Sequence, residues 1–510
     1  MSSALRTNDA NTADSSALSA ESRDWALLNA GPARRAQVLQ PPEYLGLPDC
    51  QHLALGDTLR LSAHEDLQVT QAESQRCRLT MLGFMLSWSH PERSNKAILE
   101  ALMADADGFE ATVAATNEIG GRWVLIYQTG SEVRLIHDAG GLRQVCYAER
   151  GGTVWCASQP ALLAGAATLV PDADARRFLI AQSETDPEYW WPGDSLPYLG
   201  ARALLPNHSL DVQSGDVHRF WPNADALTDR KDLGEIRDLA ARRLSGVLQA
   251  AAARSPLALG LSAGWDSRVL LAACRPVIDD MTIYTARPPT MPASHCDFDI
   301  PCQLSKKLDL THEIIDHPDT VDPGFEAIFN SHTYKAHQRF AAGLQAEYLA
   351  FRYSKLAVIG NFSEVVRMPY RHLIQDGSDV EAADLARIAG MSDSPFAKRA
   401  FESWMPSESD RHGYDVLDLF YWEQRIGRWL AANCIEFDVG WQDVLVPFNI
   451  RSLIVDLLAC DEKHRDKNHP AVYVEIMKSL WPDVLDLPIN PRPRRSLLSR
   501  LESRVRRLFR

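Results

Sequence analysis

The spacing of apolar residues divides the chain into two parts with different kinds of sheet. In the first part, Gly121–Tyr127 and Val133–Ile136 flank a turn at Gly130, which predicts a β-hairpin. Further elements expected here are strands at Thr80–Trp88, Val145–Ala148 and Thr153–Ala157 and a short helix at Lys96–Ala104. Consecutive short strands joined by tight turns predict an antiparallel sheet in an α+β domain.

The second part alternates strands with amphipathic helices. Strand Leu257–Leu261 follows a helix over Asp232–Arg254, whose apolar residues fall on one face. The elements expected next are strand Met281–Thr285, helix Asp299–Leu308, strand His312–Ile315, helix Phe340–Phe351 and strand Leu356–Ile359. This order predicts an α/β doubly wound parallel sheet that binds ligands beyond the carboxyl ends of its strands.

Length and composition fit two globular domains. A chain of 510 residues is too long for one core, and its 45% hydrophobic and 24% charged residues are ordinary values. We expect a disordered leader over residues 1–24, domains over 25–225 and 226–490, and a separate tail over 491–510.

Charge and cysteine content narrow the class of protein. The net charge of −14 argues against nucleic-acid binding. The nine cysteines show no Cys-x-x-Cys spacing, and Cys296 and Cys302 with His295 and His312 form the one cluster of metal-ligand type. We predict a cytoplasmic protein, because the thiols are scattered, no apolar run has membrane-spanning length and the leader has no signal core.

The end of the chain is strongly basic. Residues 491–510 contain eight arginines and one glutamate, and their leucines align on one helical face. A basic amphipathic tail suits docking on a membrane surface or on an acidic protein partner. Packing on the protein's own acidic domain is an equally open interpretation.

A strand–loop–helix junction carries the chemistry of the second part. Strand Leu257–Leu261 is followed by Ser-Ala-Gly-Trp-Asp-Ser at 262–267 and by a helix predicted to begin at Arg268. Such a junction directs backbone N–H groups and a helix N-terminus to one point, which is an anion-binding geometry. Serine hydroxyls add donors, and Asp266 can hold a magnesium ion between itself and phosphate oxygens.

This stretch resembles Ser-Gly-Gly-x-Asp-Ser, the pyrophosphate loop of the ATP-pyrophosphatase superfamily, with Ala263 in place of one glycine. The Gly-Lys-Ser/Thr of a Walker loop is absent from the sequence. The resemblance implies cleavage of ATP to AMP and pyrophosphate with adenylation of a substrate oxygen. It assigns ATP binding to Leu261, Ser262, Gly264, Asp266 and Ser267. An ordinary Ser/Gly-rich turn is the plainer alternative.

The first part resembles the glutaminase domain of asparagine synthetases, an Ntn-hydrolase-like class II amidotransferase domain. The family's motifs are matched at Gly121, Asp138, Gly141, Tyr147, Ala157, Ser158, Leu204–His208 and Arg219–Trp221. Such glutaminases expose a cysteine nucleophile directly after the initiator Met, whereas this chain has Ser2 there, separated from the recognisable fold by the leader. We therefore expect a domain that has lost glutamine hydrolysis.

The second part resembles the synthetase domain of the same family. This resemblance places adenine near Thr285 and an acidic residue, Asp299, on the next helix. A second family signature, Ser-Gly-x-Gly-x-Asp-Glu, is matched in shortened form by Gly360-Asn-Phe-Ser-Glu364. It implies that Gly360 and Asn361 border the ATP site and that Glu364 binds magnesium together with Asp266.

Three further residues are candidates for catalysis. Asn361 stands where the family has its general base, and an amide cannot accept a proton in that role. Asp443 precedes the proline of Val446-Pro-Phe-Asn449 by four residues, which is the spacing of an acyl-site glutamate in the family. Arg465 and Lys467 match the region of a cation that stabilises the transferring phosphate, although a solvated basic loop is equally compatible.

One further helix, around residues 421–429, contains Glu423 and Arg425, which we interpret as a solvated face.

Together these features imply an ATP-dependent, AMP-forming carbon–nitrogen ligase resembling asparagine synthetase, with ATP and Mg²⁺ as cofactors. A small-molecule or peptide carboxylate would become an acyl-adenylate and be captured by ammonia or by a substrate amine. Three alternatives stay open: an intramolecular amide former of the β-lactam synthetase or lasso-peptide cyclase type, a tRNA-modifying thiolase, and a non-catalytic nucleotide-binding scaffold. The acidic charge and unpaired cysteines weigh against the thiolase.

Overall fold

The computed structural model describes residues 37–40, 50–57, 59–130, 132–186, 188–223, 231–333, 337–351, 354–374, 379–439 and 443–491. The predicted leader with Ser2, and the basic tail beyond Pro491, lie outside the described residues.

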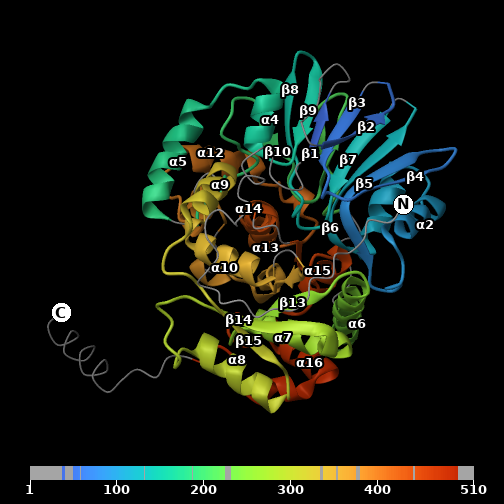
Figure 1. The fold of residues 1–510 in the computed structure, drawn as a ribbon. Coiled ribbons are helices and arrows are strands. Elements are labelled where there is room, and N and C mark those ends of the chain that lie inside the picture. Colours follow the sequence, from blue (N-terminus) through green and yellow to red (C-terminus); the bar gives the residue numbers. More distant parts are fainter. Residues whose placement is uncertain are drawn as a thin grey trace.

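Two six-stranded antiparallel sheets form the first part of the chain, drawn in blue to green in Figure 1. One sheet has the order β10-β8-β9-β1-β3-β2 and the other β12-β11-β7-β6-β5-β4. Their strands are β1 (Gln37–Gln40), β2 (Cys50–Leu55), β3 (Leu59–His64), β4 (Val69–Glu73), β5 (Arg78–Ser87), β6 (Ile119–Thr129), β7 (Glu132–His137), β8 (Cys146–Arg150), β9 (Thr153–Ala157), β10 (Arg202–Ala203), β11 (His208–Asp211) and β12 (Val217–Arg219). The helices here are α2 (Asn95–Asp105), α3 (Phe109–Ala115), η2 (Thr116–Glu118), α4 (Pro160–Ala167) and α5 (Ala173–Thr185).

The two sheets pack face to face with helices outside them. Leu61 of β3 and Leu82 of β5 belong to one buried cluster, so the inner faces of both sheets share a core. On the outer face of the second sheet, Leu125 packs in a cluster with Leu99 of α2, and α4 contributes Leu163 to the cluster outside the first sheet. The predicted hairpin β6–β7 is confirmed, whereas β8 and β9 pair in the opposite sheet.

A five-stranded parallel sheet forms the second part, with the order β15-β14-β13-β16-β17. Its strands are β13 (Leu257–Gly260), β14 (Met281–Arg287), β15 (His312–Asp316), β16 (Leu356–Val358) and β17 (Val444–Leu445). Leu257 and Leu259 pack in one core with α6 and α7, while Ala258 joins the cluster that holds Ala346 of α10. Helices therefore cover both faces, as the alternating pattern predicts.

The remaining elements run from the parallel sheet to the sandwich, with α13 and α14 lying between them in Figure 1 and α12 lying beside α5. The helices of this part are α6 (Leu233–Ala252), α7 (Trp265–Ala273), α8 (Cys296–Lys307), α9 (Pro323–Thr333), α10 (Ala341–Phe351), α11 (Ala382–Ile388), α12 (Pro395–Trp404), α13 (Val416–Phe420), the π-helix η8 (Tyr421–Leu430), α14 (Ala431–Val439), α15 (Arg451–Leu458) and α16 (Ala471–Leu480). Short 3₁₀ turns are η3 (Arg275–Asp280), η4 (Gln338–Phe340), η5 (Ser363–Arg367), η6 (Arg371–Leu373), η7 (Ser409–Arg411), η9 (Glu462–His464) and η10 (Pro482–Leu485).

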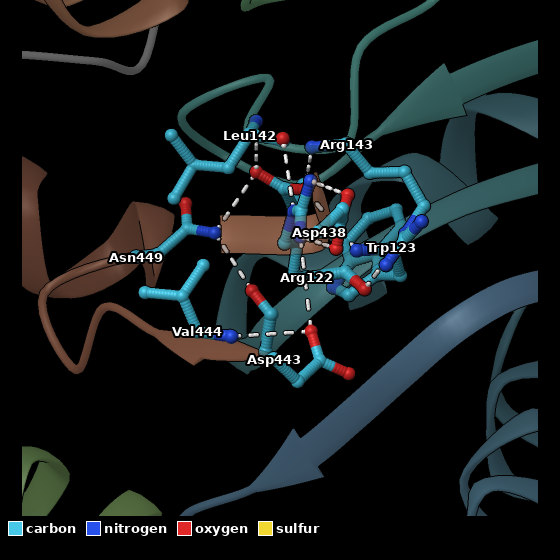
Figure 2. A network of polar contacts seen from close by, with 10 residues as sticks. Arg122, Trp123, Leu142, Arg143, Asp438, Asp443, Val444 and Asn449 are labelled. Carbon is cyan, nitrogen blue, oxygen red and sulfur yellow. Dashed lines mark hydrogen bonds and ion pairs between the residues drawn. The ribbon is translucent and has the colours of Figure 1, made fainter. Parts of the chain in front are cut away.

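A buried ion pair joins the two parts. Arg122 of β6 donates from both terminal nitrogens to Asp438 of α14, at 2.8 and 2.7 Å, and from Nε to the carbonyl of Leu142 (Figure 2). Asn449 donates to Asp138 at 2.9 Å and to the carbonyl of Gly121 at 2.7 Å. These contacts bind the motif residue Asp138 to the second part of the chain.

Glu423 is a second anchor between the two parts, and our interpretation of it as solvated is wrong. Its side chain is 0% exposed and accepts hydrogen bonds from Arg219, Asn207 (2.9 Å) and Trp404 (2.8 Å). Burial would raise the pKa of Glu423, but the charges of Arg219 and His208 and the hydrogen bonds from Arg219 and Asn207 together hold this pKa below its ordinary value. The polar pattern of η8 did not reveal that another part of the chain covers this face.

All nine cysteines are free thiols. None of the helices in the described ranges has the length and apolarity needed to cross a bilayer.

Candidate functional site

The turn after β13 is fastened to the neighbouring strand β14. The N–H of Leu261 donates to the carbonyl of Tyr284 (2.7 Å), and Oγ1 of Thr285 donates back to the carbonyl of Leu261 (2.8 Å). Helix α7 begins at Trp265, three residues before the predicted start, because Gly264 adopts the extended conformation of an N-cap. Asp266 and Ser267 therefore lie in the first helical turn.

The loop at 262–267 is cross-linked by its own serines. The hydroxyls of Ser262 and Ser267 lie 3.0 Å apart, and the N–H of Gly264 donates to Oγ of Ser262 (3.1 Å). The N–H of Ala263 donates outward, to Oδ1 of Asp297 at 3.0 Å. One backbone N–H of this loop is therefore already bonded to a carboxylate of helix α8.

Asp297, and not the predicted Asp299, is the acidic residue of the next helix that contacts the loop. Helix α8 begins at Cys296, three residues earlier than predicted, and His295 caps it by accepting from the N–H of Asp297. Asp299, the predicted residue, is exposed on this helix.

Asp266 meets the turn that follows β16. Gly360 allows this approach, because a Cβ there would lie 2.8 Å from Cβ of Asp266. Nη2 of Arg367 lies 2.9 Å from each carboxylate oxygen of Asp266, and Oγ of Ser363 donates to Oδ1. Burial raises the pKa of Asp266, and the charge of Arg367 opposes the rise.

Glu364 lies beside this pair without a full set of partners. Its Oε2 atom is buried and has no hydrogen-bond partner among the described residues. Burial, followed by the charge of Asp266, raises the pKa of Glu364 to about 7. The positive charge of Arg367, followed by that of Arg425, which stacks 3.9 Å from the ring centroid of Trp429, opposes this rise.

The two basic candidates have different surroundings. Arg465 is buried, donates to the carbonyl of Val366 (2.8 Å) and pairs with Asp418 (2.7 Å), so it supports the η5 turn from behind. Nζ of Lys467 lies 3.3 Å from Nε2 of His372. Burial and the nearby charge of Arg367 lower the pKa of Lys467.

Comparisons with known proteins give little beyond this geometry. A scan against protein-family models finds no match, and no curated protein matches the sequence. Among solved structures, glutamine phosphoribosylpyrophosphate amidotransferase from B. subtilis, complexed with ADP and GMP, is 8% identical with a TM-score of 0.23, covering 57% of this chain and 62% of that chain.

Two synthetases are similar to a comparable extent. NMN synthetase from Francisella tularensis is 18% identical (TM-score 0.20, 37% of this chain and 86% of that one). Glutamine-dependent NAD+ synthetase from Acinetobacter baumannii in complex with ADP is 14% identical (TM-score 0.20, 47% and 53%). The chain spans 62% of the amidotransferase, and TM-scores of this size carry no argument about fold or activity.

Asp443 does not join the site around Asp266. It immediately precedes β17 and lines a cavity of about 620 Å³ with Pro256 and Leu356, at the amino ends of β13 and β16. In Figure 2 its carboxylate faces Arg122 and the N–H of Val444, at 3.7 and 3.2 Å. The expected acyl-site role is incorrect, because all five strands are parallel and Asp443 lies at the edge opposite to the loop.

The other candidates lie at the carboxyl edge. Thr285 is buried, and its hydroxyl contacts Nε2 of His312 at 2.9 Å in addition to the carbonyl of Leu261. Asn361 directly follows Gly360 in the turn after β16. The suggested metal cluster is only partly assembled. The ligand atoms of His295, Cys296 and Asp297 lie within 4.8 Å of one another, whereas His312 contacts the hydroxyl of Thr285 instead.

A magnesium ion between Asp266 and Glu364 does not fit this arrangement. Oδ1 of Asp266 accepts from both Ser363 and Arg367, and Oδ2 accepts from Arg367. Mg²⁺ demands oxygen ligands in near-ideal octahedral geometry, and a guanidinium already lies against both oxygens. Sequence reasoning missed this role of Arg367, because the pairing depends on how the turn after β16 folds back.

Proposed function

We propose that this protein is an ATP-dependent ligase that activates a carboxylate as an acyl-adenylate and transfers it to an amine. The observation that carries the proposal is the meeting of the 262–267 loop with Gly360 at the carboxyl ends of β13 and β16. Ligands of open parallel sheets bind outside the carboxyl ends of the strands. The first turn of α7 adds N–H groups and the positive end of its dipole.

In this reaction the 262–267 loop holds the departing pyrophosphate. A carboxylate oxygen of the acid attacks the α-phosphorus of ATP, the bond from that phosphorus to the bridging oxygen breaks, and pyrophosphate leaves. The amine then attacks the acyl carbon, and AMP leaves with the bonding electrons of the acyl–oxygen bond. Arg367 and Lys467 are the described cations suited to face the phosphate charge.

Glu364 is suited to take the proton that the amine must lose. A general base works best with a pKa near the operating pH, and the pKa of Glu364 is about 7. Its Oε2 atom, which has no partner among the described residues, can accept from a substrate N–H, a role that the amide of Asn361 cannot take. We propose that the amine is ammonia or a substrate amine and that the sandwich domain does not hydrolyse glutamine.

A second candidate function is nucleotide binding without catalysis. The observation that favours it is that protein groups already occupy Asp266 and the amide of Ala263. The two functions differ in whether pyrophosphate is ever released.

ATP–pyrophosphate exchange tests the proposal. Labelled pyrophosphate should enter ATP in the presence of the correct carboxylic acid, and Asp266→Ala should reduce exchange at least about 100-fold, since charge-assisted contacts contribute about 3 kcal/mol. Asp299→Ala, an exposed carboxylate on α8, is the matched control. ATP binding without exchange over a broad panel of acids would favour the scaffold.

A further inference from the structure

We propose that the guanidinium of Arg367 takes the place of a divalent cation in this site and allows ATP to bind without magnesium. This inference rests on the proposed function, because it concerns the charge that faces the phosphates of ATP. It extends that function by naming the form of the substrate: free ATP instead of its magnesium complex.

The position of Arg367 is that of a chelated cation. Nη2 lies 2.9 Å from Oδ1 and 2.9 Å from Oδ2 of Asp266, which places one nitrogen on the axis of the carboxylate. A cation bound by both oxygens of a carboxylate occupies this same axis. The two side chains are 13% and 25% exposed, so the pair faces solvent only partly.

The turn that carries Arg367 is fixed from two sides. Tyr473 donates its hydroxyl to the carbonyl of Ser363 (2.5 Å), and the buried Arg465 donates to the carbonyl of Val366 (2.8 Å). These contacts hold the backbone on both sides of Glu364 and set the approach of Arg367. The guanidinium is therefore preorganised, and a magnesium ion would have to displace it.

Two groups of the same cluster still lack partners. The Nε–H of Arg367 is buried without an acceptor among the described residues, and Oε2 of Glu364 is buried without a donor. Buried polar atoms of folded proteins are nearly always paired, so such atoms indicate a ligand that completes them. A phosphate oxygen can accept from Nε, and an N–H of the substrate can donate to Oε2.

A second cation lies nearby. Lys467 is close enough to Arg367 for the two charges to repel, although its ammonium also touches the carbonyl of Pro369 (3.4 Å). Two neighbouring cations, one of them held on Asp266 of the 262–267 loop, favour an anion of high charge. Free ATP, which carries more negative charge than its magnesium complex, matches this set.

The test is ATP binding to the full chain by titration calorimetry, in excess EDTA and in excess magnesium chloride. Wild-type dissociation constants should agree within about threefold between the buffers, a difference below 1 kcal/mol. Arg367→Ala should bind at least about tenfold more weakly in EDTA and recover in magnesium, because Asp266 and Glu364 are then free for the ion. Arg371→Ala, a half-exposed arginine paired with Asp415, should behave as wild type.

A second readout needs no nucleotide. Mn²⁺ titration followed by electron paramagnetic resonance should show binding to Arg367→Ala that the wild type lacks. Wild-type ATP binding that disappears in EDTA would overturn the inference while leaving the proposed function intact. Absence of ATP binding in both buffers would instead overturn the proposed function. If Arg367→Ala fails to fold, the comparison of wild-type ATP binding in the two buffers still tests the inference. Arg367→Lys is a second variant, which retains the positive charge without the guanidinium.

Discussion

The domain interface and the candidate site are both built from buried charges, but they differ in how those charges are paired. At the interface, Arg122 is bound by Asp438 through two nitrogens, and Glu423 accepts from three different side chains. At the site, Asp266 is paired, while Glu364 and Arg367 each keep a buried atom that has no partner in the part of the chain that the structure describes. The same residue types therefore serve two purposes.

This difference shows how to separate structural charges from functional ones. A buried charge whose hydrogen bonds are met contributes to holding two elements in register, and removing one partner leaves the other uncompensated. A buried charge with unmet bonds costs stability until a ligand supplies them. Variants at the interface should therefore change stability, and variants at the site should change binding and pH response.

The largest effect is expected at the interface. Arg122→Ala leaves Asp438 buried without its cation, which should lower the free energy of unfolding by about 3–5 kcal/mol. Urea unfolding followed by tryptophan fluorescence measures it. Arg76→Ala, whose pair with Asp107 is exposed, is the control and should change stability little. A loss below about 1 kcal/mol for Arg122→Ala would remove the distinction between the two regions.

The next effect is a pH dependence that originates in the site. Because burial raises the pKa of Glu364 from 4.5 to about 7, the folded protein binds a proton there more tightly than the unfolded chain. Stability from this group is therefore greatest below pH 4.5 and is lost as the pH rises towards 7. In Glu364→Gln, the fall in the free energy of unfolding over this pH range should be smaller by about 1–3 kcal/mol. Unfolding measured at several pH values tests this.

The control for the pH series is Glu92→Gln, at an exposed carboxylate whose removal should leave the profile unchanged. An unaltered profile in Glu364→Gln would show that Glu364 is solvated and ordinary.

A smaller effect concerns the carboxylate that already sits on the loop. Asp297→Ala frees the N–H of Ala263 from a competing anion, so ATP should bind more tightly, by about fivefold for 1 kcal/mol. Asp299→Ala, on the same helix but exposed, should not alter affinity. Weaker binding in Asp297→Ala would mean that Asp297 holds the loop in shape instead of competing for it.

The smallest effect is expected at Lys467, an exposed residue near Arg367. Lys467→Ala should weaken ATP binding about two- to fivefold, and the difference should shrink at high salt because this lysine is largely exposed. Lys463→Ala, an exposed lysine paired with Asp461, serves as its control. Equal effects of the two variants would assign both to general surface charge.

Local patterns predicted much of the fold. The hairpin of β6 and β7 and the alternation of parallel strands with helices follow from periodicity and turn residues, which act over a few positions. The observed helix starts differ from the predicted ones: α7 and α8 each begin three residues earlier in the chain, because Gly264 and His295 cap them. Those shifts placed Asp266 in a helical turn and exchanged Asp299 for Asp297.

The sequence by itself determined that a serine- and aspartate-bearing loop ends a buried strand, since this requires only neighbouring residues. The tertiary structure alone decided which charges meet: Arg367 on Asp266, Arg219 on the buried Glu423, and Asp443 at the far edge beside Arg122. Pairing between residues far apart in the chain depends on strand order and on how turns fold back, and no local pattern contains that information.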